Sequence, residues 1–295
     1  MATTTQIAAP ARAASPLALW HVLSLDAPTV AVLWTWFIAR SAGIRLPIAS
    51  PLAMALAVWI VYAADRLLDA SRADHIGDSS ELEARHQFHH RHRRAFSICI
   101  ASASIALGSM LPLLDAAALR LYLFEGALLI GWFVLLHATR SAHRLPKEIA
   151  VGIFFSAAVF IPTVARNPAS RLELEPAAIL LAALCALNCL FIYAWEHGEF
   201  TAPYTSAPPH PTTRFALDHL SSLAITLALS GFALTFFAHS AVRPIAGACV
   251  LSAVFLLALD HYRNTISRIH LRASADLALL TPLLFLLLIS RLPQW

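Results

Sequence analysis

The sequence has little charge and almost no lysine. Only 13% of its 295 residues are charged, whereas 59% are hydrophobic; a soluble globular domain carries about twice that charged fraction. These values exclude a water-soluble fold, a disordered chain and a nucleic-acid-binding domain from the expected classes. The four cysteines all lie inside apolar segments, so they are expected to be small packing residues rather than a disulfide framework.

The sequence also lacks strand-like alternation of apolar and polar residues, which argues against a transmembrane β-barrel. Residues 1–16 lack a convincing basic stretch, so they are expected to form a short disordered lead rather than a cleaved signal peptide. What the chain does have is a series of apolar segments about twenty residues long, the length a helix needs to cross a bilayer. We therefore expect an all-α integral membrane protein with a single transmembrane domain over residues 17–295.

The apolar segments predict a multi-pass bundle of about nine helices. Their expected ranges are 17–39, 47–64, 95–113, 118–138, 149–165, 176–196, 217–239, 244–262 and 273–291. Prolines stand at four expected helix starts, namely Pro16, Pro47, Pro176 and Pro244. Pro28 and Pro282 lie inside the first and last spans and are expected to kink them.

Charge predicts the orientation. With the N-terminus in the cytoplasm, two thirds of the 21 basic residues fall on the inner side, which is typical of a bacterial inner-membrane protein. Most acidic residues fall on the same side, so several span ends are expected to surround one cytoplasmic mouth that attracts a divalent cation. Asp26 and Glu125 lie within spans, where a charge costs about 3 kcal/mol or more, so both are expected to face the bundle interior.

The strongest motif ends the second span and reads Tyr62-Ala-Ala-Asp65-Arg66-Leu-Leu-Asp69. Asp65 and Asp69 are four residues apart, so both carboxylates share one helix face and could hold Mg²⁺ through oxygen ligands. Arg66 and the nearby Arg72 could bind phosphate oxygens. A helix end with i,i+4 ion pairs explains the same spacing equally well, and the spacing alone leaves both interpretations open.

This stretch resembles part of the first aspartate-rich motif of the UbiA superfamily of intramembrane prenyltransferases, Asn-Asp-x-x-Asp-x-x-x-Asp. That superfamily has nine transmembrane helices, a cytoplasmic mouth and two such motifs, after helices 2 and 6. The nine predicted spans are similar to this layout along most of the chain. Lys147 and Gly152 also resemble a basic residue before helix 5 and a glycine in the first turns of that helix.

The sequence departs from the family pattern at both motifs. Val61 and Tyr62 stand where the family has Asn-Asp, so two oxygen ligands of the first metal are absent. The second motif is reduced to Glu196 and Glu199, which are three residues apart. If the family's chemistry survives in this chain, the resemblance implies one Mg²⁺ rather than two.

The resemblance implies transfer of a prenyl group from a prenyl diphosphate to an aromatic or other lipophilic acceptor. In that reaction Mg²⁺ and basic side chains neutralise the departing diphosphate. It implies metal binding by Asp65, Asp69, Glu196 and Glu199, diphosphate binding by Arg66, Arg72 and Lys147, and substrate binding by Tyr62, Tyr193 and Trp195. The π faces of these aromatic residues could stabilise a carbocation, although an interfacial aromatic belt is the commoner explanation.

Two other functions remain open. One is a catalytically degenerate UbiA-like protein that binds a lipid or a partner, which the altered motifs favour. The other is a transporter, which is less favoured because the acidic residues do not follow the whole depth of the spans and no inverted repeat is evident.

Several further side chains are expected to have structural roles. Arg272 and Asp276 are four residues apart and are expected to pair with each other, and Asn188 is expected to form an interhelical hydrogen bond. In the cytoplasmic loop and helix at residues 65–94, His86 and His90 are four residues apart and could ligate a transition metal. The favoured expectation is that this segment lies on anionic lipid, and a cover over the mouth is a further alternative.

Overall fold

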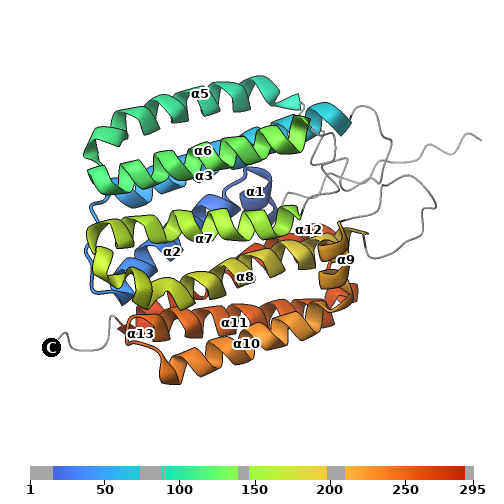
Figure 1. Cartoon of the computed structure of the whole chain (residues 1–295). Helices are drawn as coiled ribbons and strands as arrows, with labels where there is room; N and C mark the ends of the chain where they lie inside the picture. Colours follow the sequence, from blue (N-terminus) through green and yellow to red (C-terminus); the bar gives the residue numbers. More distant parts are fainter. Residues whose placement is uncertain (1–15, 74–87, 89–90, 139–145, 198–209, 290–295) are drawn as a thin grey trace, which may run out of the picture.

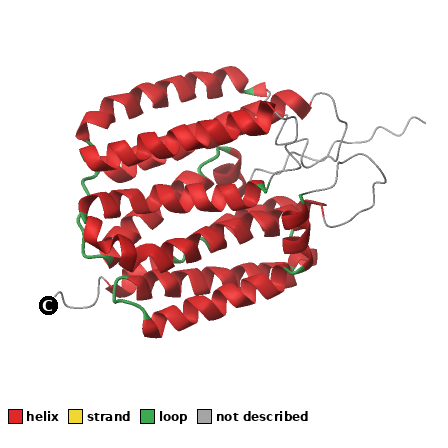
Figure 2. Ribbon diagram, in the orientation of Figure 1, coloured by secondary structure: helices red, strands yellow, loops and turns green. Residues whose placement is uncertain are grey.

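The computed structural model describes residues 16–73, 88, 91–138, 146–197 and 210–289. Within these ranges all regular structure is helical (Figure 2). The chain is therefore an all-α, multi-pass membrane protein, as predicted. Of the predicted loop and helix at residues 65–94, residues 74–87, which include His86, and residues 89–90 lie outside the described residues.

In the described part of the chain, seven helices are long and apolar enough to cross a membrane. They are α3 (Ala49–Ala73), α5 (Arg93–Met110), α6 (Ala116–Ala138), α7 (Lys147–Arg166), α8 (Arg171–His197), α10 (Leu220–Phe237) and α11 (Val242–His261). These helices run side by side through the bundle (Figure 1). They correspond to the seven middle spans of the sequence prediction.

The first and last predicted spans are each divided into two shorter helices. The first consists of α1 (Pro16–Val22) and α2 (Asp26–Ser41), and the last consists of α12 (Arg268–Ala278) and α13 (Pro282–Ile289). A short helix α9 (Pro211–Asp218) precedes α10. The two divided spans pack on each other, because α12 contacts both α1 and α2 while α13 contacts α2.

Contrary to expectation, the first and last spans do not kink at Pro28 and Pro282 but break at other residues. Pro28 lies in the first turn of α2, where its missing N–H removes no helical bond, and Pro282 is the first residue of α13. The first break is at Ser24, a buried residue with φ of 59°. The expectation that Pro176 begins a helix is wrong as well: α8 begins at Arg171, directly after a 3₁₀ turn that starts at Pro168.

The core is formed where α8 packs between α7 and α11, with α2 against the same cluster. Trp34 and Phe37 of α2 and Phe191 of α8 are fully buried there. The α7–α8 contact is very close at Gly152, where an added Cβ atom would lie 2.3 Å from the carbonyl oxygen of Ala182. A small residue is needed for backbones to approach this closely, as is common between membrane helices.

Helices α5 and α6 form one outer side of the bundle, opposite α10 (Figure 1). Only 6% of each of these candidate spans is buried inside the protein, and large apolar side chains such as Ile105 and Phe124 are exposed along them. Exposed apolar helices of this length are expected to contact the acyl chains of the bilayer.

Candidate functional site: a buried polar cluster at the two helix breaks

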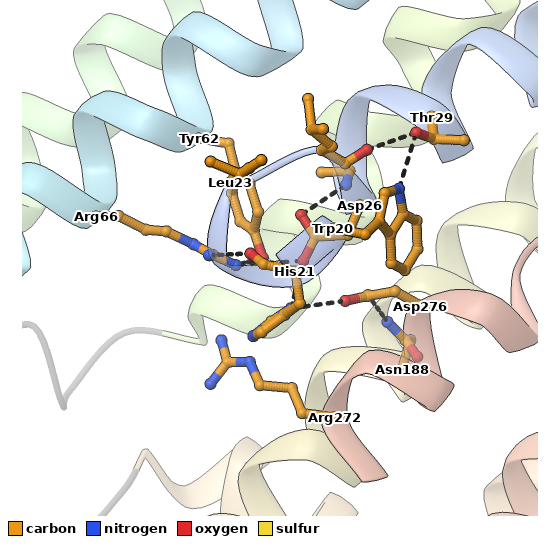
Figure 3. Close-up of polar contacts among 12 residues, drawn as sticks. Trp20, His21, Leu23, Asp26, Thr29, Tyr62, Arg66, Asn188, Arg272 and Asp276 are labelled. Carbon is orange, nitrogen blue, oxygen red and sulfur yellow. Dashed lines mark hydrogen bonds and ion pairs between the residues drawn. The ribbon is translucent and has the colours of Figure 1, made fainter. Parts of the chain in front are cut away.

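A polar cluster lies where the divided spans meet α3 and α8, and it begins at the break between α1 and α2 (Figure 3). The Ser24 N–H donates to the His21 carbonyl and the Leu25 N–H donates to the Trp20 carbonyl, each at 3.1 Å. With Ser24 in the left-handed region, this is the Schellman ending of a helix. The turn allows α2 to begin at Asp26, directly beside the end of α1.

Asp26 is the centre of the cluster. Its Oδ2 lies 2.6 Å from His21 Nδ1 and 3.3 Å from an Arg66 guanidinium nitrogen, while its Oδ1 accepts the Ala27 N–H at 3.0 Å. Neither His21 nor Asp26 has more than 1% of its side chain exposed. A carboxylate buried this deeply needs such partners, because an isolated buried charge is strongly unfavourable. The prediction that Asp26 faces the bundle interior is confirmed.

Arg66 joins α3 to the break. Its Nη1 donates to the His21 carbonyl at 2.7 Å, and its Nη2 donates to the Tyr62 hydroxyl at 2.9 Å as well as to Asp26. The guanidinium carbon also lies 4.3 Å from the centre of the Tyr62 ring, within the range of a cation–π contact. Only 7% of the Arg66 side chain is exposed, so this cation is committed to internal partners.

Helices α8 and α12 supply the other side of the cluster. Asn188 Nδ2 donates to Asp276 Oδ1 at 3.3 Å, and Asp276 Oδ2 lies 3.8 Å from His21 Nδ1. Arg272 forms an ion pair with Glu196, and Figure 3 places its guanidinium beside the His21 ring. The expected pairing of Arg272 with Asp276 is wrong: the two side chains have different partners, because α12 lies between α8 and α1.

The formal charges of the cluster nearly cancel. Three carboxylates, on Asp26, Asp276 and Glu196, face two guanidinium groups, on Arg66 and Arg272. One negative charge remains, and a single proton shared among His21, Asp26 and Asp276 would balance it. Asp276 Oδ2, Asn188 Oδ1 and Arg272 Nε are buried without a hydrogen-bond partner among the described residues, so this corner is also the least satisfied part of the cluster.

His21, Asp26 and Asp276 each offer one ligand atom, and these atoms lie within 4.8 Å of one another. The 2.6 Å separation of His21 Nδ1 and Asp26 Oδ2 is a hydrogen-bond distance. It is too short for two ligands of one zinc or magnesium ion, whose bonds are about 2.0–2.2 Å long and about 90–109° apart. This geometry fits a shared proton better than a shared metal ion.

The residues predicted on α3 are divided between this cluster and the end of the helix. Tyr62 and Arg66 belong to the cluster, and Asp65, which is half-buried, also has an interaction partner. Asp69 and Arg72 lie in the last two turns of α3, and their side chains are outside the described part of the structure.

The remaining predicted residues lie near the same end of the bundle. Lys147 is the exposed first residue of α7. Tyr193, Trp195 and Glu196 lie in the last turns of α8, where Trp195 Nε1 donates to Asp260 at 2.9 Å. Glu199 lies outside the described residues. The structure thus brings Tyr62, Arg66 and Glu196 into one network through His21, Asp26 and Arg272, and it assigns Trp195 a separate partner.

Sequence reasoning missed His21 entirely. His21 and Asp26 are five residues apart, which in a continuous helix would put them on different faces. The available signal was Asp26 two residues before Pro28, a combination typical of a helix start. A helix start at Asp26 would have divided the first predicted span and placed His21 at the end of a separate helix.

In comparisons with protein-family models, curated proteins and solved structures, the chain matches none of them.

Proposed function

We propose that this protein is a membrane protein that binds a lipid without catalysing prenyl transfer, and that its UbiA-like diphosphate-binding positions have become structural. The observation that carries the proposal is the pairing of Arg66, whose guanidinium donates to Asp26, Tyr62 and the His21 carbonyl. Releasing Arg66 to bind a diphosphate would leave Asp26 buried without its cation. Breaking a buried pair in this way costs about 3–5 kcal/mol.

The second motif supports the same proposal. The resemblance implies that Glu196 is a metal ligand, but Glu196 pairs with Arg272. The guanidinium group of Arg272 would therefore compete with a metal ion for this carboxylate. Trp195, implied as a substrate contact, is held by Asp260, and Asp260 also pairs with Arg263 at 3.2 Å. These side chains bind one another at the end of the bundle, so their charges are not available to a ligand.

The lipid-binding part of the proposal is supported by the outer side of the bundle. A groove lies between α3 and α5 and is lined by apolar and basic side chains. Such a lining suits an amphiphile with an anionic head group better than it suits a soluble metabolite, because both parts of the amphiphile find a matching surface.

A second candidate is the Mg²⁺-dependent prenyltransferase. It is favoured by Asp65 and Asp69, which are four residues apart within one continuous helix, and by the exposed Lys147 at the same end of the bundle. In this candidate the α3 pair would hold the metal, because Glu196 is committed to Arg272. Bound Mg²⁺ would supply charge neutralisation for the departing diphosphate.

One experiment separates the candidates. The full chain in detergent is heated with and without Mg²⁺ and geranylgeranyl diphosphate, and labelled diphosphate is followed with a mixture of aromatic acceptors. The lipid-binding proposal predicts that Mg²⁺ adds nothing to any stabilisation by the diphosphate and that no label is transferred. Stabilisation that requires both ligands would contradict it, since a ligand present at 100 times its Kd stabilises by about 2.7 kcal/mol. Loss of that stabilisation in Asp65→Asn/Asp69→Asn would assign it to the α3 pair.

A further inference from the structure

The strongest unassigned feature is the groove between the end of α3 and the start of α5. It has a volume of about 610 Å³ and is lined by Leu67, Leu68, Arg93, Arg94, Ser97 and Ile98. The groove is separate from the polar cluster, since none of its lining residues belongs to that network. Leu67 and Leu68 make the α3 side of the lining apolar. Helix α5 contributes Ile98, Ser97 and two adjacent arginines in its first turn.

The position of the groove matches the level of lipid head groups. The candidate span of α3 ends at Leu68, and the candidate span of α5 begins at Arg93. Both helices therefore leave the hydrocarbon layer beside the groove. Arginines at this level reach the head groups while apolar side chains one turn away remain among the acyl chains.

Arg93 and Arg94 are exposed, and neither forms an ion pair within the described part of the chain. No acidic residue stands in the first turn of α5, and His92 provides no side-chain cap. Two cations at the start of a helix oppose the helix dipole. Their position is thus unfavourable for the helix alone and becomes favourable when an anion is bound beside them.

We propose that the α3–α5 groove binds an anionic glycerophospholipid of the surrounding bilayer, with its phosphate on Arg93 and Arg94 and an acyl chain along Leu67, Leu68 and Ile98. Charge complementarity selects the anionic head group, and the position at the end of two spans selects a bilayer lipid as its source. This inference rests on the proposed lipid-binding function and names the lipid class and its site.

The test is native mass spectrometry of the full chain released from detergent, with phosphatidylglycerol or phosphatidylcholine of identical acyl chains. The wild type is expected to retain phosphatidylglycerol about thirtyfold better than phosphatidylcholine, given the typical contribution of two interfacial arginines. Arg93→Gln/Arg94→Gln should lose this preference. The matched control is Arg171→Gln/Arg243→Gln, which removes two exposed arginines at the other end of the bundle and should keep it.

A third variant tests the groove without changing charge. Ser97→Trp places a large side chain in the groove and should reduce phosphatidylglycerol retention, with circular dichroism confirming an unchanged helix content. Undiminished preference in both groove variants would overturn this assignment, even if the protein still bound lipid elsewhere and the broader function stood. Displacement of phosphatidylglycerol by equimolar geranylgeranyl diphosphate would also overturn it. Label transfer in the prenyl-transfer assay would instead contradict the broader function.

Discussion

His21 Nδ1 lies 2.6 Å from Asp26 Oδ2 across the break between α1 and α2. The two residues belong to different helices, and the left-handed turn at Ser24 brings them together. Arg66 binds both residues, since it donates to the Asp26 carboxylate and to the backbone carbonyl of His21. The ion pair thus joins the first span to α3.

Replacing Asp26 with Asn should destabilise the protein strongly. Arg66 would remain buried without a carboxylate, at a cost of about 3–5 kcal/mol. The double variant Asp26→Leu/Arg66→Met should recover much of that loss, because it removes both buried charges. Melting in detergent, followed by intrinsic tryptophan fluorescence, measures the difference. Equal losses in the single and double variants would show that the uncompensated charge of Arg66 is not the cause of the destabilisation.

Removing the Glu196 carboxylate should give a smaller loss. The Glu196 and Arg272 side chains are 22% and 20% exposed, so solvent weakens their ion pair, and we expect Glu196→Gln to cost about 1–2 kcal/mol. A double-mutant cycle with Arg272→Gln isolates the pairwise contribution. A structural Glu196 predicts a lower melting temperature with no change in any response to Mg²⁺. A Mg²⁺ response that disappears in Glu196→Gln would instead make it a metal ligand.

Gly152→Val should disrupt the packing of α7 on α8. Even a Cβ atom would lie 2.3 Å from the Ala182 carbonyl oxygen, which is backbone and cannot rotate away. We expect a loss of several kcal/mol, at the upper end of overpacking costs. The matched control is Gly131→Val on α6, where nothing lies within 4 Å of an added Cβ. A similar fall in melting temperature for both variants would refute the close-contact explanation.

Trp195→Phe should have a modest effect. It removes the hydrogen bond from Trp195 Nε1 to Asp260 while keeping an aromatic ring beside Phe191. Side-chain hydrogen bonds between membrane helices contribute about 0.6 kcal/mol on average, and Asp260 keeps its pairing with Arg263. A small fall in melting temperature with unchanged phosphatidylglycerol retention is therefore expected. Loss of retention would identify Trp195 as a ligand contact instead.

The sequence by itself determined that the chain is an all-α membrane protein, and it located seven spans to within several residues. Both follow from composition and from segment length, because a bilayer admits apolar helices of about twenty residues. The same reasoning placed Asp26 inside the bundle, since a charge facing lipid would be too costly. It could not determine which charged side chains pair at the ends of these helices, because several pairings would satisfy the same charges.

Only the tertiary structure decided those pairings. The i,i+4 spacing favoured Arg272 with Asp276, yet α12 lies against α8 and α1, so Arg272 pairs with Glu196 and Asp276 lies near His21. The α1–α2 break likewise depends on contacts far away in the sequence. Ser24 holds its left-handed conformation in a site where Arg66 donates to the His21 carbonyl, which also accepts the Ser24 N–H. Local propensity disfavours that conformation, because the Cβ atom of a non-glycine residue makes the left-handed region unfavourable by about 1–2 kcal/mol.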